Sequence, residues 1–518
     1  MIWRQVFNRA GVMLLILALA LAGCQGASNG GIPSWLGGLI QTVEAPTPTP
    51  APPQATPVGT PTSPAALPLA SDATPTQVKN PLPPVQAAEL KGTTITVLYP
   101  WSGQAGQGFQ SLVDQFNRAN TWGITVTAVM AGSQSEVAGW MKGALGTPQP
   151  TSTTPGLSEP PPALPDVVVA DPVAASGWQA TGSPLVDLGP YIGDPTWGLT
   201  GAEKKDLATG QWPGAGGSQS ASGPVLAAPA QRSMVLLFYN QGWAQSLGFT
   251  RPPVTPGDFR QQACKAAQAN QYDPDPQRRG TGGWLITADA LPVLAWIEVY
   301  GGQIGPNAQG LYTFNTPQVT QAFTFLKNLE NQNCAWVGRE ALPYPYFASR
   351  DALFYVGTLD DIPAQSNAMK TASHPDAWTV IPFPSADGKP FVLTDDLAYY
   401  LVKTNRLRQM AGWLFIRWLE SSQAQVQWVK MVGTAPLGVS VNAVLAGFRA
   451  QNPQLSAAFD LRSLARPQPA QASWSIASGV LSDGASQVLQ PEATLDVIPA
   501  VLAQMDQTAA ELIARQAR

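Results

Sequence analysis

Residues 166–171 read DVVVAD, a run of four apolar residues between two aspartates. A strand this continuously apolar is typical of a parallel sheet that is covered on both faces. Two β-branched runs precede it, TITVLY at 94–99 and ITVTAV at 124–129, and apolar residues at helical spacing separate the three, over 109–116 and 137–144. This alternation of strands and helices predicts an open α/β sheet.

The N-terminus has the pattern of an export signal. Arg4 and Arg9 precede an apolar run over residues 12–22, which is shorter than the roughly 20 residues that a membrane span needs. The tetrad LAGC at residues 21–24 resembles a bacterial lipobox. That resemblance implies a signal peptide over residues 1–23 and a lipid on Cys24. An ordinary signal peptide with an incidental cysteine is the alternative.

Composition excludes several classes of function. The chain has 518 residues, a net charge of −4 and only 12% charged residues, so no basic surface for nucleic acid is expected. With a single histidine, His374, neither a His-rich metal site nor a Ser–His–Asp triad is expected. We predict no cofactor and no metal. After removal of the leader, the length suits two or three domains.

A Pro- and Thr-rich segment follows the predicted lipidation site. It includes PTPTP at residues 46–50 and PLPP at 81–84. Such a composition cannot bury enough apolar area to fold, and proline extends it toward polyproline II. We therefore predict that residues 24–89 are a lipidated N-terminus and a disordered linker, which carries a globular part beginning near Leu90.

Short motifs in the globular part resemble the family 1 extracellular solute-binding proteins of ABC importers, which include sugar-binding proteins. The matching segments are ITVLYPWSG at 95–103, PDVVVAD at 165–171, LLFYNQ at 236–241, FASRDALF at 347–354 and GTAP at 433–436. The sequence departs from the family's usual pattern in one place. A Gly-Gly pair often precedes the region of Asp395, where this chain has Thr394-Asp395-Asp396, which points to a distinctive ligand.

The resemblance implies a two-lobe α/β fold like that of the type II periplasmic binding proteins, each lobe a mixed sheet flanked by helices. It also implies that the chain crosses between the lobes three times. The predicted first lobe takes residues 90–224 plus 393–432, and the second takes 225–392 plus 433–518. The predicted crossings lie near residues 223–230, 392–396 and 432–437.

Ligand contacts are expected beyond the carboxyl ends of strands. After the first and third strands this rule selects Trp101, Ser102, Gln104 and Asp171. The resemblance adds the residues at the crossings and in a cleft loop, which are Arg232, Thr358, Asp360, Asp361, Asp395 and Asp396. Trp284, in a glycine-rich segment, and Tyr346, between prolines, are further aromatic candidates for stacking.

Each candidate also has a structural reading. Trp101 could be a core residue, Asp171 a helix N-cap, Arg232 part of an ordinary ion pair that stabilises a lobe, and the remaining carboxylates solvated surface charge. Cys264 and Cys334 are expected to form a disulfide in an exported protein, with two buried thiols as the alternative.

The function predicted from these features is that of an extracytoplasmic receptor of an ABC transporter. It would capture a sugar or oligosaccharide by hinge closure, dock on the permease and carry out no covalent chemistry. We expect a monomeric membrane lipoprotein that faces the periplasm or the cell exterior. Clustered carboxylates with aromatic residues leave a polyamine or other small solute open, and paired carboxylates leave a glycan-acting enzyme open. A structural or sensory lipoprotein is a further alternative.

Overall fold

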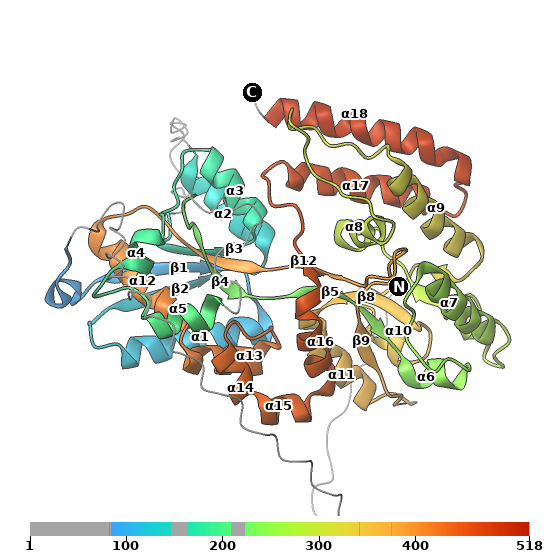
Figure 1. The fold of residues 1–518 in the computed structure, drawn as a ribbon, viewed down its shortest axis with the longest axis horizontal. Coiled ribbons are helices and arrows are strands. Elements are labelled where there is room, and N and C mark those ends of the chain that lie inside the picture. The colour runs from blue at the N-terminus through green and yellow to red at the C-terminus, as the bar shows by residue number, and fades with distance from the viewer. Residues whose placement is uncertain are drawn as a thin grey trace, which may run out of the picture. The chain divides into compact units, whose positions relative to one another are not determined.

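The computed structural model describes residues 82, 84–146, 163–208, 223–340, 342–373 and 375–516. These residues form two β-sheets with helices packed on their faces (Figure 1). The predicted signal peptide, Cys24 and most of the predicted linker lie outside the described residues. No helix among the described residues is long and apolar enough to cross a membrane.

The first sheet has five strands in the order β2-β1-β3-β11-β4. They are β1 (Thr94–Tyr99), β2 (Thr125–Met130), β3 (Val167–Ala170), β4 (Ala227–Gln231) and β11 (Leu397–Leu401). β1 pairs in parallel with β2 and β3, as the sequence predicts, while β11 runs antiparallel between β3 and β4. All four residues of β3 are buried, which explains its unbroken apolar sequence.

Helices cover the first sheet and supply its aromatic core. They are α1 (Gly103–Ala119), α2 (Gln134–Leu145), α3 (Pro172–Ala180), α4 (Gly189–Gly193), α5 (Gly201–Ala208), α12 (Arg406–Leu419) and α13 (Ser422–Val432). Phe109 and Phe116 of α1 meet Phe415 of α12 and Trp428 of α13 in a cluster of edge-on ring contacts.

The second sheet has seven strands. Six follow the order β12-β10-β5-β8-β6-β7, and β9 pairs with β5 beside this path. The strands are β5 (Met234–Tyr239), β6 (Trp284–Leu285), β7 (Ala335–Trp336), β8 (Phe354–Thr358), β9 (Thr379–Ile381), β10 (Val392–Thr394) and β12 (Ala465–Arg466). Parallel and antiparallel pairs both occur, so this sheet is mixed like the first.

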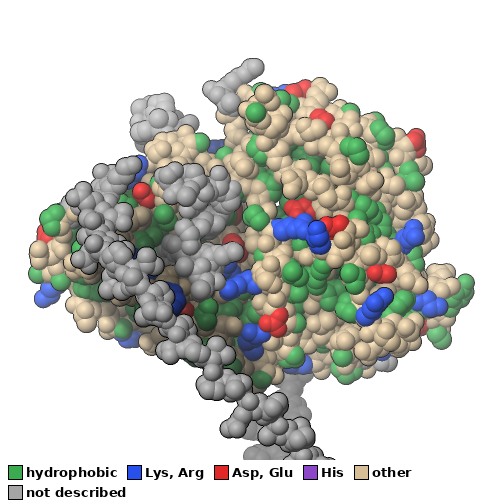
Figure 2. Space-filling view, in the orientation of Figure 1, with side chains coloured by type: hydrophobic (Ala, Val, Ile, Leu, Met, Phe, Trp, Pro, Cys, Tyr) green, Lys and Arg blue, Asp and Glu red, His purple; other side chains and the backbone are tan. Residues whose placement is uncertain are grey.

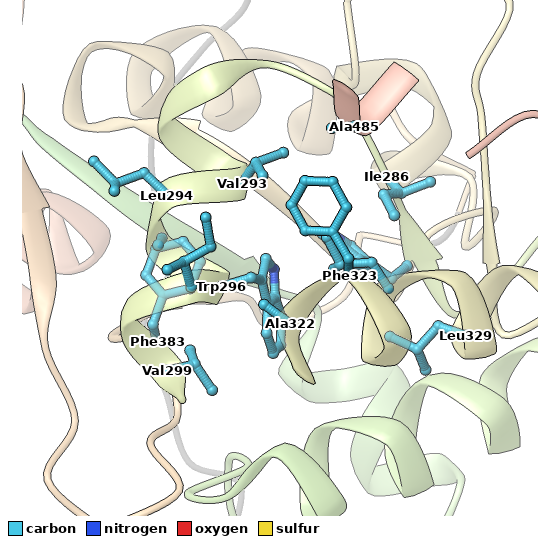
Figure 3. Packing of buried hydrophobic residues seen from close by; sticks show 14 of the residues in the cluster. Ile286, Val293, Leu294, Trp296, Val299, Ala322, Phe323, Leu329, Phe383 and Ala485 are labelled. Atoms are coloured by element: carbon cyan, nitrogen blue, oxygen red, sulfur yellow. The ribbon is translucent and has the colours of Figure 1, made fainter. Parts of the chain in front are cut away.

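The remaining described α-helices lie between and after these strands. They are α6 (Gln241–Ser246), α7 (Pro256–Gln271), α8 (Ala290–Val299), α9 (Pro317–Asn331), α10 (Tyr344–Ala348), α11 (Ile362–Lys370), α14 (Val439–Val444), α15 (Ala446–Gln451), α16 (Pro453–Asp460), α17 (Trp474–Val488) and α18 (Ile498–Gln516). Trp296 of α8, Phe323 of α9 and Phe383, which follows β9, belong to one buried cluster (Figure 3).

The chain joins the two sheets at specific points. It leaves the first sheet after β4 and enters the second at β5, so Arg232 and Ser233 form the connection. It returns between β10 and β11 through Asp395 and Asp396. The predicted α/β fold with a mixed sheet in each part is confirmed, while the exact lobe boundaries stay a prediction.

The predicted linker extends too far toward the globular part. Val85 is 7% exposed and packs in the core of the first sheet, and residues Ala87–Leu90 form a short 3₁₀ helix. Arg406 donates to the Pro84 carbonyl at 2.8 Å and pairs with the Glu89 carboxylate. Residues 84–89 therefore belong to the folded part, because these contacts hold the chain against α12.

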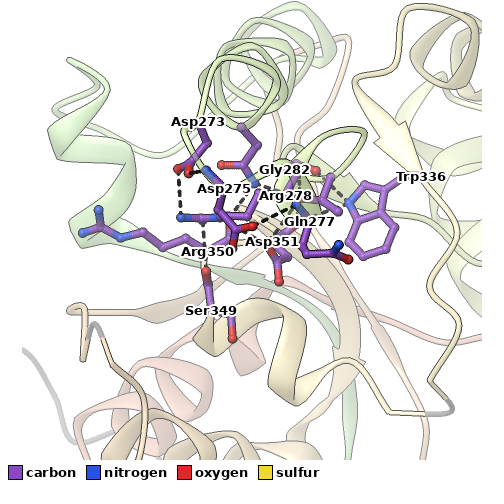
Figure 4. Close-up of polar contacts among 11 residues, drawn as sticks. Asp273, Asp275, Gln277, Arg278, Gly282, Trp336, Ser349, Arg350 and Asp351 are labelled. Carbon is purple, nitrogen blue, oxygen red and sulfur yellow. Dashed lines mark hydrogen bonds and ion pairs between the residues drawn. The ribbon is translucent and has the colours of Figure 1, made fainter.

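A polar network fixes the connection between α7 and β6 (Figure 4). Arg278 forms ion pairs with Asp273 at 3.2 Å and Asp351 at 3.4 Å. It also donates to the carbonyls of Ser349 and Arg350 at 3.0 and 2.8 Å. These contacts tie the loop to the turn before β8. On the face shown in Figure 2, charged side chains of both signs are scattered among polar and apolar ones.

Candidate functional site

A cavity of about 240 Å³ opens where the two sheets are connected. Its lining residues come from both sheets and from the connections between them, and they are Gln134, Asp171, Val173, Gln231, Asp360, Asp395, Leu397 and Gln468. Asp171 directly follows β3, and Gln231 ends β4. The general expectation that ligands bind beyond the carboxyl ends of strands holds for both.

Asp171 combines a structural role with a place in the cavity wall. Its Oδ1 accepts a hydrogen bond from the Ala174 N–H at 2.8 Å, which caps α3, and Pro172 follows at the first helical position. The Asp171 N–H donates to Gln134 Oε1 at 3.2 Å, which joins the starts of α2 and α3. The N-cap interpretation of this residue is confirmed, and its contact with a ligand stays a prediction for a side chain that lines the cavity.

Gln231 connects the two sides of the cavity and is only 6% exposed. Its Oε1 accepts the indole N–H of Trp101, and its Nε2 donates to Asp360 Oδ2 at 2.6 Å. Ser233 Oγ donates to the same Asp360 oxygen at 3.3 Å. Asp360 belongs to the short 3₁₀ helix Leu359–Asp361 after β8, so this amide joins a residue of the first sheet's core to the second sheet.

Beside the cavity, segments distant in sequence are held together by hydrogen bonds. Arg232 Nη1 pairs with Asp396 Oδ2 at 3.1 Å, and the Asp395 N–H donates to the Ser233 carbonyl at 3.0 Å. The Arg232 N–H donates to Thr434 Oγ1 at 2.9 Å. Residues 232–233, 395–396 and 434 therefore meet at one junction, the first of them just beyond the predicted crossing at 223–230.

The crowded carboxylates have shifted pKa values. Part of Asp360 is open to the cavity, but the protein packed around it displaces bulk water and, with the charges of Asp395 and Asp361, raises its pKa to about 7. Burial, then the charges of Asp396 and Asp171, raises the pKa of Asp395 to about 6. Burial also raises the pKa of Asp396, against the opposing effect of Arg232.

The predicted site residues divide into those that line the cavity, those paired beside it and those that lie elsewhere. Asp171, Asp360 and Asp395 line the cavity, with Arg232 and Asp396 paired beside it. Asp361 is turned to other partners, because it accepts the Thr358 N–H and the Tyr344 hydroxyl, both at 2.6 Å. Ser102, Gln104 and Thr358 are not among the residues that line this cavity.

The three predicted aromatic contacts are wrong for this cavity. Trp284 is 1% exposed and packs on Phe259 and Trp296, with ring centroids 5.5 and 5.3 Å away. The preceding Gly283 has φ +56°, and a Cβ there would lie 2.1 Å from the Cys334 carbonyl oxygen. The glycines thus permit close packing of β6, where the sequence interpretation expected a loosened cleft segment.

Trp101 and Tyr346 are occupied in other ways. Trp101 is 8% exposed, packs on Phe109 and Trp428, and positions Gln231 through its indole N–H. The Tyr346 hydroxyl accepts the N–H groups of Arg339 and Glu340, both at 2.9 Å. Neither ring presents a face to the described cavity, so the expected aromatic stacking has no support there.

Several lining residues were not among the predicted contacts. Gln134 begins the helix after β2, and the strand-end rule that selected Asp171 would have found it. Gln468 follows β12, far along the chain, and its Nε2 contacts Asp395 Oδ1 at 3.4 Å. Nothing in the local sequence distinguishes Gln468 from the other glutamines of the chain.

The two remaining cysteines are joined. Cys264 of α7 and Cys334, directly before β7, form a disulfide across a sequence separation of 70. The bond ties a helix to the edge strand of the second sheet, away from the cavity residues.

Two α/β parts that enclose a small cavity at their connections define the class of two-lobe binding proteins. A family model described as a bacterial extracellular solute-binding protein matches residues 111–457, which is more than half of the chain. The chain belongs to this family. Its members are binding proteins, and the family name places them outside the cell.

Solved structures share the fold at low sequence identity. The sugar-binding protein MalE from Xanthomonas citri aligns with a TM-score of 0.65 at 16% identity, covering 82% of this chain and 98% of that one. UgpB from Mycobacterium tuberculosis, in complex with glycerophosphocholine, gives 0.62 at 18% identity, covering 82% and 100%. The cyclic alpha-maltosyl-1,6-maltose binding protein from Arthrobacter globiformis gives 0.61 at 16% identity, covering 80% and 98%. A search of curated proteins gave no match.

Proposed function

We propose that this protein is the extracytoplasmic receptor of an ABC importer and captures a small carbohydrate between its two lobes. The observation that carries the proposal is the cavity itself, because residues from both sheets and from the junction line it. A solute held there contacts both lobes at once, so binding energy favours the closed arrangement.

Carbohydrate is the first choice of solute for a chemical reason. Carboxylate and amide oxygens accept hydrogen bonds from hydroxyl groups, and amide nitrogens donate to ring or hydroxyl oxygens. Three carboxylates and three glutamines among eight lining residues supply both kinds of group. Sugar-binding proteins among the structures of the same fold agree with this choice.

One apolar contact between the lobes lies at the cavity. Val173 of α3 lines the cavity and packs against the buried cluster of the second sheet. Because an apolar contact of this kind forms only when the lobes meet, we infer that Val173 helps to hold the closed state.

The setting of the receptor is the cell envelope. Export agrees with the family. We infer that Cys24 is lipidated and that residues 24–83 form the spacer between the membrane and the folded part. A monomer that docks its closed form on the permease fits this arrangement.

A thermal-shift and calorimetric screen of mono- and oligosaccharides against the full-length protein tests the proposal. A solute at about 100 times its Kd should raise the free energy of unfolding by about 2.7 kcal/mol. Small-angle scattering should show compaction with the same solute. Asp171→Asn should weaken binding without unfolding, because asparagine can still cap α3, while the exposed Asp289→Asn should bind normally. A protein that neither binds nor compacts with any carbohydrate would contradict the proposal.

A further inference from the structure

The cavity carries more negative charge than a neutral solute requires. Asp171, Asp360 and Asp395 supply three carboxylates, and no described lining residue is a lysine, an arginine or an aromatic residue. Arg232, at the neighbouring junction, is paired with Asp396 at 3.1 Å. That pair is neutral as a unit, so it offsets none of the negative charge of the cavity carboxylates, of which Asp360, with a pKa of about 7, is about half ionised at pH 7.

Each of these carboxylates has an oxygen available to a guest. Ala174 N–H occupies Asp171 Oδ1, Gln231 occupies Asp360 Oδ2, and Gln468 occupies Asp395 Oδ1. Ser233 Oγ donates to the same Asp360 oxygen as Gln231, so the hydrogen bonds between described residues reach one oxygen of each carboxylate and leave Asp171 Oδ2, Asp360 Oδ1 and Asp395 Oδ2 without one. Three free acceptors around one small cavity call for a guest rich in donors.

A neutral sugar could donate hydrogen bonds to the cavity carboxylates, but it would not offset their negative charge. Hydroxyl groups donate to carboxylates, but they add no positive charge to a cavity that is partly shielded from water. A protonated amine donates three hydrogen bonds and also offsets the charge, and hydrogen bonds between charged groups are the stronger kind.

The size of the cavity limits the rest of the solute. At about 240 Å³ it lies below the roughly 300–1,000 Å³ typical of sites for drug-sized ligands. A single sugar ring suits it better than an oligosaccharide does.

We propose that the captured carbohydrate is a monosaccharide bearing a protonated amine, which the carboxylates of Asp171, Asp360 and Asp395 recognise. This inference rests on the proposed function and names the solute class of the same site. The location of the site is inferred from the cavity and the family, and the solute class is inferred from the negative charge of the cavity carboxylates.

Calorimetry of the full-length protein at pH 7 tests the inference with four probes, which are glucosamine, glucose, N-acetylglucosamine and putrescine. Glucosamine should bind at least tenfold more tightly than glucose, which lacks the amine, and N-acetylglucosamine, whose amide is neutral. Asp395→Asn should lower the affinity for glucosamine at least tenfold, and Asp360→Asn should do the same. Asp289→Asn removes an exposed carboxylate with no capping hydrogen bond and should leave the affinity unchanged.

The outcomes separate this inference from the proposed function. Equal binding of glucose, N-acetylglucosamine and glucosamine would overturn the amine and leave the carbohydrate receptor standing. Tight binding of putrescine with none of the sugars would support the amine and overturn the carbohydrate. Binding of none of the four probes at millimolar concentration would overturn the inference, and the wider carbohydrate screen would then decide the proposed function.

Discussion

At the scale of single residues, Gln231 links the two sides of the cavity through its hydrogen bonds to Trp101 and Asp360. A carboxylate in its place could not donate to Asp360, and an apolar residue would satisfy neither Asp360 nor the indole of Trp101. The side chain is also almost fully buried, so water cannot replace the lost partners. Its position between two polar groups makes Gln231 sensitive to replacement.

Replacing Gln231 with alanine should lower the free energy of unfolding by about 1–3 kcal/mol, because the indole N–H of Trp101 loses its acceptor in a buried setting. Solute affinity should fall as well, since Asp360 is no longer held. Chemical denaturation measures the first effect and calorimetry the second. Gln107→Ala, on the exposed face of α1, is the control and should change neither quantity. Unchanged stability of the Gln231 variant would show that the amide is not needed to hold the junction.

The raised pKa of Asp360 predicts that the free energy of unfolding of the solute-free protein depends on pH. Its pKa rises from 3.8 to about 7 on folding, so the folded protein binds this proton more tightly than the unfolded chain does. The contribution of Asp360 to stability is therefore complete below about pH 4 and is lost as the pH rises to 7.

Denaturation at pH 5 and pH 8 can measure this effect. The free energy of unfolding should fall more steeply with pH in the wild type than in Asp360→Asn, since asparagine does not titrate. Asp289→Asn should follow the wild type. Parallel curves for the wild type and Asp360→Asn would mean that the carboxyl titrates normally in the folded protein.

At the scale of elements, the two sheets illustrate which strands a sequence reveals. β1, β2 and β3 carry apolar runs that are separated by amphipathic helices, so their existence and parallel pairing follow from pattern, whereas the position of β1 between β2 and β3 was not predicted. β6, β7 and β12 have two residues each, too few for any periodicity to appear. Their pairing depends on neighbours that the rest of the fold brings to them.

Gly283 tests how closely β6 must approach its neighbours. An added Cβ would lie 2.1 Å from the Cys334 oxygen and 2.7 Å from the Ala263 oxygen, both backbone atoms. Gly283→Ala should therefore cost about 3 kcal/mol or more. Gly280→Ala is the matched control: its φ is also positive, at +79°, but no atom lies within 4 Å, so about 1–2 kcal/mol is expected. Equal losses by denaturation would show that backbone conformation, not close packing, requires glycine at residue 283.

At the scale of the whole molecule, the solute site depends on the chain passing between sheets. Residues 231–233, 395–396 and 434 meet at one junction, and none of these segments is part of a site without the others. This arrangement lets a solute at the cavity influence both lobes, which a pocket inside one lobe could not do.

The N-terminal anchor also belongs to this scale. Cys24→Ala should remove lipid labelling and move the protein from the membrane fraction to the soluble fraction, since a single apolar run of this length does not anchor a mature chain. Fractionation with radiolabelled fatty acid measures both. Cys264→Ser serves as the control and should keep its label. Membrane retention of unlabelled Cys24→Ala would show that another feature holds the protein there.

The acidic residues at the junction came from the family resemblance, while the sequence pattern by itself determined the α/β class, the parallel core of the first sheet and Asp171 at a strand end. It could do so because apolar periodicity and strand ends are local features. Only the tertiary structure decided that Asp171, Asp360 and Asp395 share one cavity with Gln231 and Gln468, and that Trp101, Trp284 and Tyr346 do not line it. The physical reason is that a tryptophan in a core and one on a cavity wall have the same local sequence, and long-range packing alone separates them.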